Sequence, residues 1–262
     1  MIPVSVAIIT KSEEKDIEDA LISVKDFEDI VVVDSFSEDR TVEICRRYTD
    51  RVFQHQWMGY AKQKQMAVNL AKKEWVLILD ADERVSPELK SEIEERIKDT
   101  FFSGFYIPRK SFFLGRWIKH SGWSPDYTLR LFKKDVSYIE QKEVHERVVV
   151  RGEVGYLKNP LLHYTYRSLS EYIKKMEEYS TLSAKEILLK SPHPSHFFLI
   201  FRMTVSPVFT FFNMFFLRQG FLDGMYGFVL AILYSFYTFL KYVKVWEKTL
   251  GERMKAGGKE NG

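Results

Sequence analysis

Cysteine is almost absent from the sequence, since Cys45 is the only one among 262 residues. An intramolecular disulfide is therefore excluded, and such low cysteine usage suits a reducing compartment. Cys45 lies in a helical pattern beside Arg46 and Arg47. We interpret it as a small buried hydrophobe rather than a reactive thiol, because free cysteines are among the most buried residues in proteins.

A strong charge of one sign is also lacking, as are the motifs of nucleic-acid binding. The formal net charge is only +3, and no C-x-x-C, RNA-binding or helix-turn-helix signature accompanies it, so we do not expect a nucleic-acid partner. The first ten residues contain no basic stretch ahead of their apolar run. We therefore expect no signal peptide and a protein that stays in the cytoplasm.

The sequence does contain enough apolar material for a large core, because 45% of its residues are hydrophobic. Short β-branched runs alternate with helical patterns in the first third of the chain. The expected strands cover residues 4–9, 30–33, 51–53 and 75–80, and the expected helices start near residues 17, 41 and 60. This alternation predicts an α/β fold with a parallel sheet.

The stretch WVLILDADE, residues 75–83, has the pattern of a fully buried strand that ends at an acidic loop. Ligands of open α/β sheets bind at the carboxyl ends of the strands, and Asp80 and Asp82 could hold a hard divalent cation there. Without such a strand, an acidic pair is more commonly a solvated turn or a helix cap. Ser86 and Pro87 then predict the start of the next helix.

Polar residues follow the other expected strands as well. Asp34 stands at the end of the second strand, so we place it in the site, whereas Ser37 and Asp39 are interpreted as caps of the following helix. Lys62 and Lys64 fall in the first turns of the third helix, whose positive dipole end favours an anion. The alternative for either lysine is an ordinary solvated helix face.

Four features now stand in a fixed order: Thr10 with Glu13 and Glu14, then Asp34 and Ser35, then Lys64, then the acidic cluster 80–83. In this order the chain resembles the inverting family 2 glycosyltransferases, which have the GT-A nucleotide-sugar-binding fold, over roughly its first 165 residues. Within that family it looks most like the bacterial lipopolysaccharide core β-glucosyltransferases. The stretches that support this closer likeness are residues 112–134, residues 143–148 (EVHERV) and the apolar C-terminal region.

The resemblance implies roles for the donor side of the site. Thr10 and Asp34 would line a uracil pocket, with Glu14 beside it and Asp34 accepting the N–H of the base, and Lys64 would lie next to the nucleotide. Asp80 would face the ribose or a metal-bound water. Asp82 would bind the Mg²⁺ or Mn²⁺ that bridges the diphosphate.

The sequence departs from the family pattern in the same loops. Ser12 replaces a more usual asparagine, and Phe36 and Arg40 stand where glycine is common. These changes leave the expected class intact and concern the detailed geometry of the loops.

Sugar transfer with inversion needs a base for the acceptor hydroxyl and stabilisation of the leaving diphosphate. Glu146 is the favoured base because its His-Glu pair matches related transferases, with an ion pair to a nearby arginine as the alternative. Asp126 is the competing base, and Glu143 is a further acid in the same region.

The glycosyltransferase hypothesis also suggests roles for three other residues. Trp123 could stack on an acceptor sugar. Arg130 would reach a phosphate, unless it only packs its stem on neighbouring leucines. His163 would complete the metal shell, although a lone histidine at a strand end is more often structural.

The composition changes after residue 194. Residues 169–189 predict an amphipathic helix with Tyr172, Met176 and Tyr179 on one stripe. The uncharged runs 203–217 and 224–240 are each shorter than the roughly twenty residues of a spanning helix, and Pro207 interrupts the first.

These runs predict an aromatic helical hairpin turned at Arg218, Gln219 and Gly220 and lying in one leaflet. A helical pair packed on a partner subunit and a two-span anchor are the alternatives. Basic residues that would suit anionic headgroups follow the hairpin: Lys241, Lys244, Lys248, Arg253 and Lys255.

We thus expect a GT-A domain at residues 1–166, a connecting helix at 167–194, a membrane-associating hairpin at 195–250 and a disordered tail at 251–262. The expected location is the cytoplasmic face of the inner membrane, peripheral or monotopic.

The leading functional hypothesis is metal-dependent transfer of a hexose, glucose from UDP-glucose, onto a membrane-bound glycolipid such as lipopolysaccharide inner core. A polyprenyl-phosphate sugar transferase would share the fold and differ in the acceptor. A sugar nucleotidyltransferase should show a glycine-rich loop after the first strand, and TKSEEKD has no glycine. A non-catalytic nucleotide-sugar-binding membrane protein is disfavoured because an idle acidic cluster on a buried strand would be destabilised by mutual repulsion.

Overall fold

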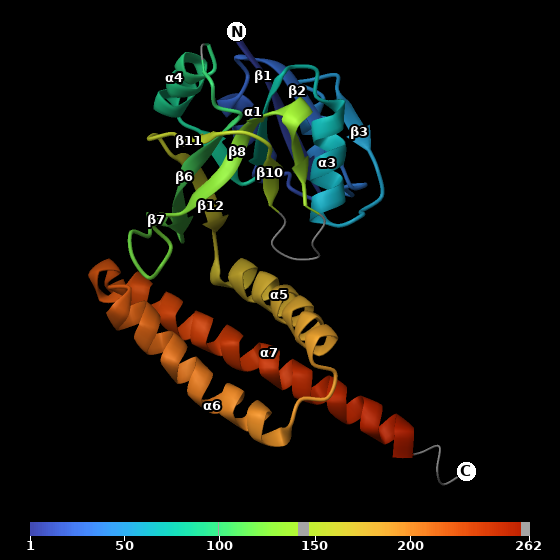
Figure 1. Cartoon of the computed structure of the whole chain (residues 1–262), viewed down its shortest axis with the longest axis vertical. Helices are drawn as coiled ribbons and strands as arrows, with labels where there is room; N and C mark the ends of the chain where they lie inside the picture. Colours follow the sequence, from blue (N-terminus) through green and yellow to red (C-terminus); the bar gives the residue numbers. More distant parts are fainter. Residues whose placement is uncertain (99, 141–146, 258–262) are drawn as a thin grey trace. The chain divides into compact units, whose positions relative to one another are not determined.

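The computed structural model describes residues 1–98, 100–140 and 147–257, with side chains described as far as residue 250. The chain divides into two compact units (Figure 1). The first contains Met1–Ser111 and Pro125–Thr165, and the second contains Phe112–Ser124 and Tyr166–Gly262. The assignment of residues 112–124 to the second unit has no counterpart in the domain limits expected from the sequence.

Four parallel strands form one half of the main sheet of the first unit. In sheet order they are β3 (Val52–Gln54), β2 (Phe27–Asp34), β1 (Ile2–Thr10) and β4 (Trp75–Asp80). The helices that alternate with them along the chain are α1 (Ile17–Ser23), α2 (Thr41–Cys45) and α3 (Tyr60–Leu70). The α/β alternation predicted from the sequence is therefore confirmed.

Beyond β4 the sheet becomes mixed. The strands continue as β8 (Tyr127–Lys133), β6 (Gly104–Phe113), β12 (Leu161–Tyr166) and β5 (Glu83–Val85), and β8 is antiparallel to β4. β11 (Val154–Tyr156) and β7 (Arg116–Trp117) also pair with β6, while β9 (Ser137–Ile139) and β10 (Val148–Val150) form a small separate sheet. The 3₁₀ turn Lys134–Val136 lies between β8 and β9.

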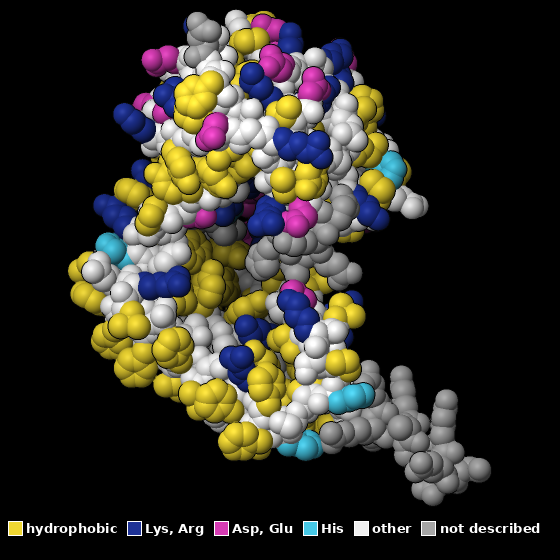
Figure 2. All heavy atoms as spheres, viewed as in Figure 1, with side chains coloured by type: hydrophobic (Ala, Val, Ile, Leu, Met, Phe, Trp, Pro, Cys, Tyr) yellow, Lys and Arg dark blue, Asp and Glu magenta, His cyan; other side chains and the backbone are white. Residues whose placement is uncertain are grey.

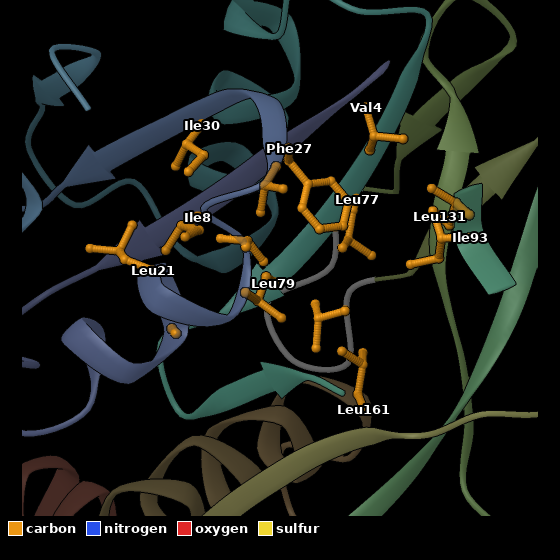
Figure 3. Close-up of a cluster of buried hydrophobic side chains, with 14 of the residues drawn as sticks. Val4, Ile8, Leu21, Phe27, Ile30, Leu77, Leu79, Ile93, Leu131 and Leu161 are labelled. Carbon is orange, nitrogen blue, oxygen red and sulfur yellow. The ribbon is translucent and has the colours of Figure 1, made fainter. Parts of the chain in front are cut away.

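Successive residues of a strand point to opposite faces of its sheet, so the apolar residues of β1, β2 and β4 fill a core on each face. Val4, Ile8 and Leu77 belong to the core that α1, α2 and α4 (Pro87–Arg96) cover (Figure 3). Ala7 and Ile78 belong to the core under α3. Burial on both faces explains why these strands have no polar alternation in the sequence.

Of the helix starts predicted in this unit, that at Ser86 is confirmed and the caps predicted for α2 are corrected. The Ser86 side chain accepts the Leu89 N–H at 3.2 Å and so caps α4. Asp39 accepts the N–H of Thr41, the first residue of α2, but the cap position is Arg40. Ser37, the other predicted cap, bonds to Asp34 and Ser12 and not to the helix. Cys45 is fully buried, and burial raises the pKa of its thiol to about 12, as expected for a structural cysteine.

The second unit is helical after β12. Its helices are α5 (Leu169–Lys190), α6 (His196–Phe212) and α7 (Met225–Gly257), with a π turn (Asn213–Leu217) and a 3₁₀ turn (Gly220–Asp223) between α6 and α7. Gln219 adopts the left-handed conformation with φ of 55°, so the chain reverses where the sequence predicted a turn. α7 packs along both α5 and α6.

Three sequence-based expectations for this unit are corrected. Pro207 lies inside α6 instead of interrupting it. The buried stripe of α5 consists of Tyr172, Met176, Ser180 and Ala184, a four-residue spacing that leaves Tyr179 40% exposed. α7 continues through residues 251–257, where a disordered tail was expected.

Two segments of the described chain, His196–Leu217 and Met225–Leu250, are long and apolar enough to cross a membrane by length and composition. Only 11% of the first apolar window and 28% of the second is buried within the chain itself. Figure 2 shows hydrophobic side chains gathered on the surface of α6 and of the turn that follows it. These segments are longer than the runs recognised in the sequence.

Candidate active site

Strand register brings the predicted donor residues to one edge of the sheet. Thr10 pairs with Asp34 across β1 and β2, and Ile9 pairs with Asp80 across β1 and β4. The carboxyl ends of these three parallel strands therefore meet, which is where α/β sheets bind ligands. Each strand contributes a polar residue at its last position.

The loops after β1 and β2 are tied together by backbone donors. The N–H groups of Ser12 and Glu13 donate to the Ser37 and Thr41 hydroxyls, both at 2.8 Å. The Glu14 carboxylate accepts the Arg40 N–H at 3.2 Å. Glu14 thus joins the two loops while its side chain stays at the surface.

Two of the departures from the family pattern occupy strained backbone. Ser12 and Phe36 have φ values of 57° and 54°, the left-handed region that asparagine and glycine adopt at lower cost. The residues usual in the family are therefore those that this loop geometry favours. The third departure, Arg40, does not share this conformation.

Asp34 is fully buried and organises its own loop. One carboxylate oxygen accepts from the Ser37 hydroxyl, and the other accepts from the Ser37 N–H at 3.0 Å and from Gln54 Nε2 at 3.2 Å. A carboxylate offers about four acceptor positions, so one remains for a base N–H. Next to it, the buried Thr10 hydroxyl has no hydrogen-bond partner among the described residues.

Asp80 lies between two cations. Lys64 Nζ is 3.0 Å from one carboxylate oxygen, and Arg130 Nη2 is 2.5 Å from the other. Burial alone would raise the pKa of Asp80, but Arg130 and Lys64 hold it well below its usual range. The sequence placed all three residues on the donor side, and the structure brings them into one cluster.

Glu83 is the residue of this cluster that sequence reasoning missed. It is fully buried, accepts the Asp80 N–H at 3.1 Å and pairs with Arg130 at 3.0 Å. Its short strand β5 pairs with β12, and this pairing takes Glu83 out of the acidic loop in which the sequence placed it. The only hint of this in the sequence is the helix start predicted at Ser86, because it leaves just residues 84–86 between the acidic loop and α4.

The cluster of charged side chains extends from Glu83 to Arg109, whose Nη1 is 3.5 Å from Glu83 Oε1. Arg109 in turn donates two hydrogen bonds to Asp126, at 2.9 and 2.6 Å. Asp126, predicted as the competing base, is therefore held by an arginine. The favoured base, Glu146, and the further acid Glu143 lie outside the described residues.

Asp82 and His163 form the predicted metal pair. His163 Nε2 is 3.4 Å from Asp82 Oδ2, and the register of β12 against β5 sets this approach. His163 Nδ1 lies 3.2 Å from the Ser111 hydroxyl and 3.3 Å from that of Thr165. Such contacts fix a ring so that its other nitrogen faces the ion in many metal sites.

These residues fit a hard divalent cation that is shared with a ligand. Carboxylate oxygens suit Mg²⁺ and Mn²⁺, and imidazole suits several transition metals. Across the described part of the chain, no group of three or more potential metal-binding side chains gathers. An ion held by Asp82 and His163 would thus need further oxygens, such as those of a diphosphate.

Trp123, predicted to contact the acceptor, belongs to the second unit. Its ring lies among Phe113, Tyr166 and Tyr234, with ring centroids 6.2 to 6.5 Å away. Its indole N–H is buried without a hydrogen-bond partner among the described residues.

A family model and several relatives match this chain over more than half of its length. The family model described as Glycosyl transferase family 2 matches residues 5–164. A glycosyltransferase of Rickettsia typhi is 32% identical, with 95% of this chain and 89% of the relative covered. The lipopolysaccharide core biosynthesis glycosyltransferase LpsC of Rhizobium meliloti is 29% identical, with coverages of 94% and 93%.

Among solved structures, the mannosyltransferase PcManGT from Pyrobaculum calidifontis, in complex with GDP-Man and Mn²⁺, gives a TM-score of 0.51 at 15% identity. The match covers 93% of this chain and 87% of that one, and it shows a shared GT-A fold. With the family model spanning more than half of its length, this chain belongs to glycosyl transferase family 2.

Proposed function

We propose that this glycosyltransferase moves a hexose from a nucleotide sugar, with UDP-glucose as the donor, onto a membrane-bound glycolipid of the lipopolysaccharide inner-core type. The observation that carries the proposal is the pairing of Asp82 with His163 beside the Asp80 cluster, at the carboxyl end of β4. The similarity to LpsC, which is named for lipopolysaccharide core biosynthesis, supports the choice of acceptor.

The donor nucleotide would lie over the ends of β1 and β2. The unpartnered Thr10 hydroxyl and the remaining acceptor position of Asp34 are suited to the polar edge of a pyrimidine base. Asp80 is fixed by Lys64 and Arg130, so it can accept a ribose hydroxyl without moving. Preorganised groups of this kind lower the cost of ordering the complex.

The diphosphate would lie between the donor pocket and the Asp82–His163 pair. These two residues would hold Mg²⁺ or Mn²⁺, which when bound supplies positive charge for the leaving diphosphate. Lys64 and Arg130 add fixed positive charge next to Asp80. Electrostatic groups that are already oriented stabilise charge that develops in the transition state.

Inversion requires a base on the acceptor side. Glu146 remains our favoured base, and Asp126 the competing one. Asp126 accepts two hydrogen bonds from Arg109. If Glu146 takes the proton, the role that we assign to Asp126 is therefore to orient Arg109. The comparison of Glu146→Gln with Asp126→Asn in a transfer assay separates the two candidates.

The apolar segments of the second unit would place the enzyme at a bilayer, on its cytoplasmic face. Exposed aromatic residues along α6, among them Phe201, Phe209 and Phe212, offer the apolar surface that an interfacial helix needs. Lys244 is not free for lipid headgroups, because it binds Glu177 and Thr181.

The test is calorimetric binding of UDP, UDP-glucose and GDP-mannose to the full chain, with Mn²⁺, with Mg²⁺ and with EDTA. We expect metal-dependent binding of the uridine nucleotides that is lost in Asp82→Asn and weakened in His163→Gln. Glu94→Gln, which changes an exposed carboxylate on α4, is the matched control.

Folded protein that binds none of these nucleotides would overturn the proposal. Equal binding in EDTA and in Mn²⁺ would overturn the metal part alone. Tighter binding of GDP-mannose than of UDP-glucose would overturn the choice of donor.

A further inference from the structure

A pocket of about 350 Å³ lies entirely within the second unit. It is formed by the loop that contains Ser121 and Trp123, by the end of α6 with the following π turn, and by α7. The polar groups on its wall are Ser121, Trp123, Thr210, Asn213, Arg218 and Tyr234. None of these residues is needed to explain the nucleotide site described above.

Two donors in this wall are buried without partners. Ser121 is 1% exposed, and its hydroxyl finds no hydrogen-bond partner in the described chain. The indole N–H of Trp123 is also buried without a hydrogen-bond partner among the described residues. Buried polar groups are nearly always satisfied in proteins, so two adjacent exceptions that line one pocket point to a ligand.

Arg218 provides the charge of the pocket. Its guanidinium lies directly over Gly122, where an added Cβ would be 2.1 Å from Nη1, and Gly122 has a φ of +80°. The positive φ favours glycine at this position, and the missing Cβ leaves room for the guanidinium. No carboxylate of the described residues pairs with Arg218, and it is the only charged residue among those that line the pocket.

The loop under the pocket is fixed in place. Asp223 is 3% exposed and accepts the N–H groups of Lys119 and His120, at 3.2 and 2.8 Å. The N–H of Ser121 then donates to the carbonyl of Arg218 at 2.9 Å. The donors are thus held in position in advance, which suits recognition of a small ligand.

A cationic fork, an indole N–H and a hydroxyl are complementary to an anion with several acceptor oxygens, and a phosphate group meets this requirement. Phe209, which lines the pocket, is 62% exposed, and Phe212 and Leu217 of the same segment are 53% and 71% exposed. A free phosphate would make no use of them, whereas acyl chains would.

We propose that this pocket binds the phosphate group of an anionic lipid, with the acyl chains lying along α6. The binding does not depend on sugar transfer or on a nucleotide. It can therefore be measured, and can fail, independently of the function proposed above.

The full chain is purified in neutral maltoside micelles and titrated with short-chain phosphatidylglycerol, and binding is followed by native mass spectrometry and tryptophan fluorescence. We expect saturable binding that Arg218→Gln weakens by about tenfold, because a charge-assisted hydrogen bond is lost. Trp123→Phe should also weaken it and should remove much of the fluorescence change. Arg218→Lys, which keeps the charge but loses the planar fork, should fall between wild type and Arg218→Gln.

Lys185→Gln is the control, because it removes the same charge from an exposed position of α5 outside the pocket. Equal effects of Lys185→Gln and Arg218→Gln would overturn the proposal by showing that only net charge matters. Phosphatidylcholine that binds as well as phosphatidylglycerol would overturn it by showing that apolar contact is sufficient. Inorganic phosphate that binds as tightly as the lipid would show that the acyl chains contribute nothing, and would overturn the lipid assignment.

Discussion

The two compact units differ in how completely they bury their large apolar side chains. In the first unit, apolar strands fill two closed cores, and the buried Arg130 pairs with the buried Glu83 and with the partly exposed Asp80. In the second unit, large apolar side chains of α6 remain exposed, among them Phe209 and Phe212. Apolar side chains enclosed in a core indicate a unit that is self-sufficient, whereas large exposed apolar side chains indicate a surface that expects a ligand or a bilayer.

The largest effect that this contrast predicts is at Glu83. Replacement by alanine would remove the buried acceptor of the Asp80 N–H and one of the two carboxylates that pair with Arg130. We expect Glu83→Ala to lower the free energy of unfolding by about 3–5 kcal/mol, measured by urea denaturation. Glu74→Ala, which removes an exposed carboxylate paired with Lys133, should cost less than about 1 kcal/mol. Similar losses in both variants would mean that the cluster does not stabilise the first unit.

The second prediction compares apolar residues of the two units. Leu77 is fully buried in the first unit, so Leu77→Ala should cost about 2–5 kcal/mol of folding free energy. Phe212 and Phe216 are about half exposed, and their double replacement by alanine should change stability much less. It should instead weaken vesicle binding by roughly tenfold or more.

Co-sedimentation with liposomes and urea denaturation of the same samples give both quantities. Unchanged vesicle binding in the double phenylalanine variant, with stability lost as in Leu77→Ala, would show that α6 packs as a core helix.

Burial and pairing also explain which features of the structure could be predicted from the sequence. The strands β1, β2 and β4 were predictable because burial on both faces demands continuous apolar runs. Asp80 and Asp82 were predictable because they follow such a run. Local patterns and motif order were sufficient wherever a feature depends on neighbours along the chain.

Features set by distant pairing were not predictable. β5, β9, β10 and β11 have three residues each, too few for any periodicity. The burial of Glu83 depends on β12, nearly eighty positions later, and the arginine that holds Asp126 comes from β6. The length of α6 was underestimated because Pro207, which usually breaks a helix, is accommodated within it.

The third prediction concerns the pH dependence of a buried carboxylate in the first unit. Burial alone would raise the pKa of Asp29, but hydrogen bonds from Ser5, the Lys72 N–H and Arg51 lower it overall. Since the folded pKa lies below the unfolded value near 3.8, the stabilisation is complete above that value. It is lost as the pH falls through the folded pKa.

Asp29→Asn should therefore be less stable than wild type at neutral pH, and the gap should narrow on acidification below about pH 4. Urea denaturation across this range measures it. A gap that is independent of pH would show that the loss comes from packing and not from the charge.

The smallest predicted effect is in the backbone of the loops that shape the two sites. Phe36 in the first unit and Gln219 in the second both have left-handed φ values, 54° and 55°, and both are exposed. Alanine usually stabilises a chain relative to glycine, because glycine loses more freedom on folding. At these two positions the order should reverse, with each glycine variant more stable than its alanine variant by about 1 kcal/mol.

Thermal denaturation of the four variants measures this difference, and the alanine variant at the same position removes the side-chain contribution from each comparison. Phe36 belongs to the loop beside the proposed nucleotide pocket, and Gln219 follows Arg218, which lines the pocket proposed to bind a lipid phosphate. The same variants therefore separate the two units functionally. Phe36→Gly should alter nucleotide binding only, and Gln219→Gly should alter lipid binding only. An alanine variant that equals or exceeds its glycine partner in stability would show that the loop at that position relaxes out of the left-handed conformation.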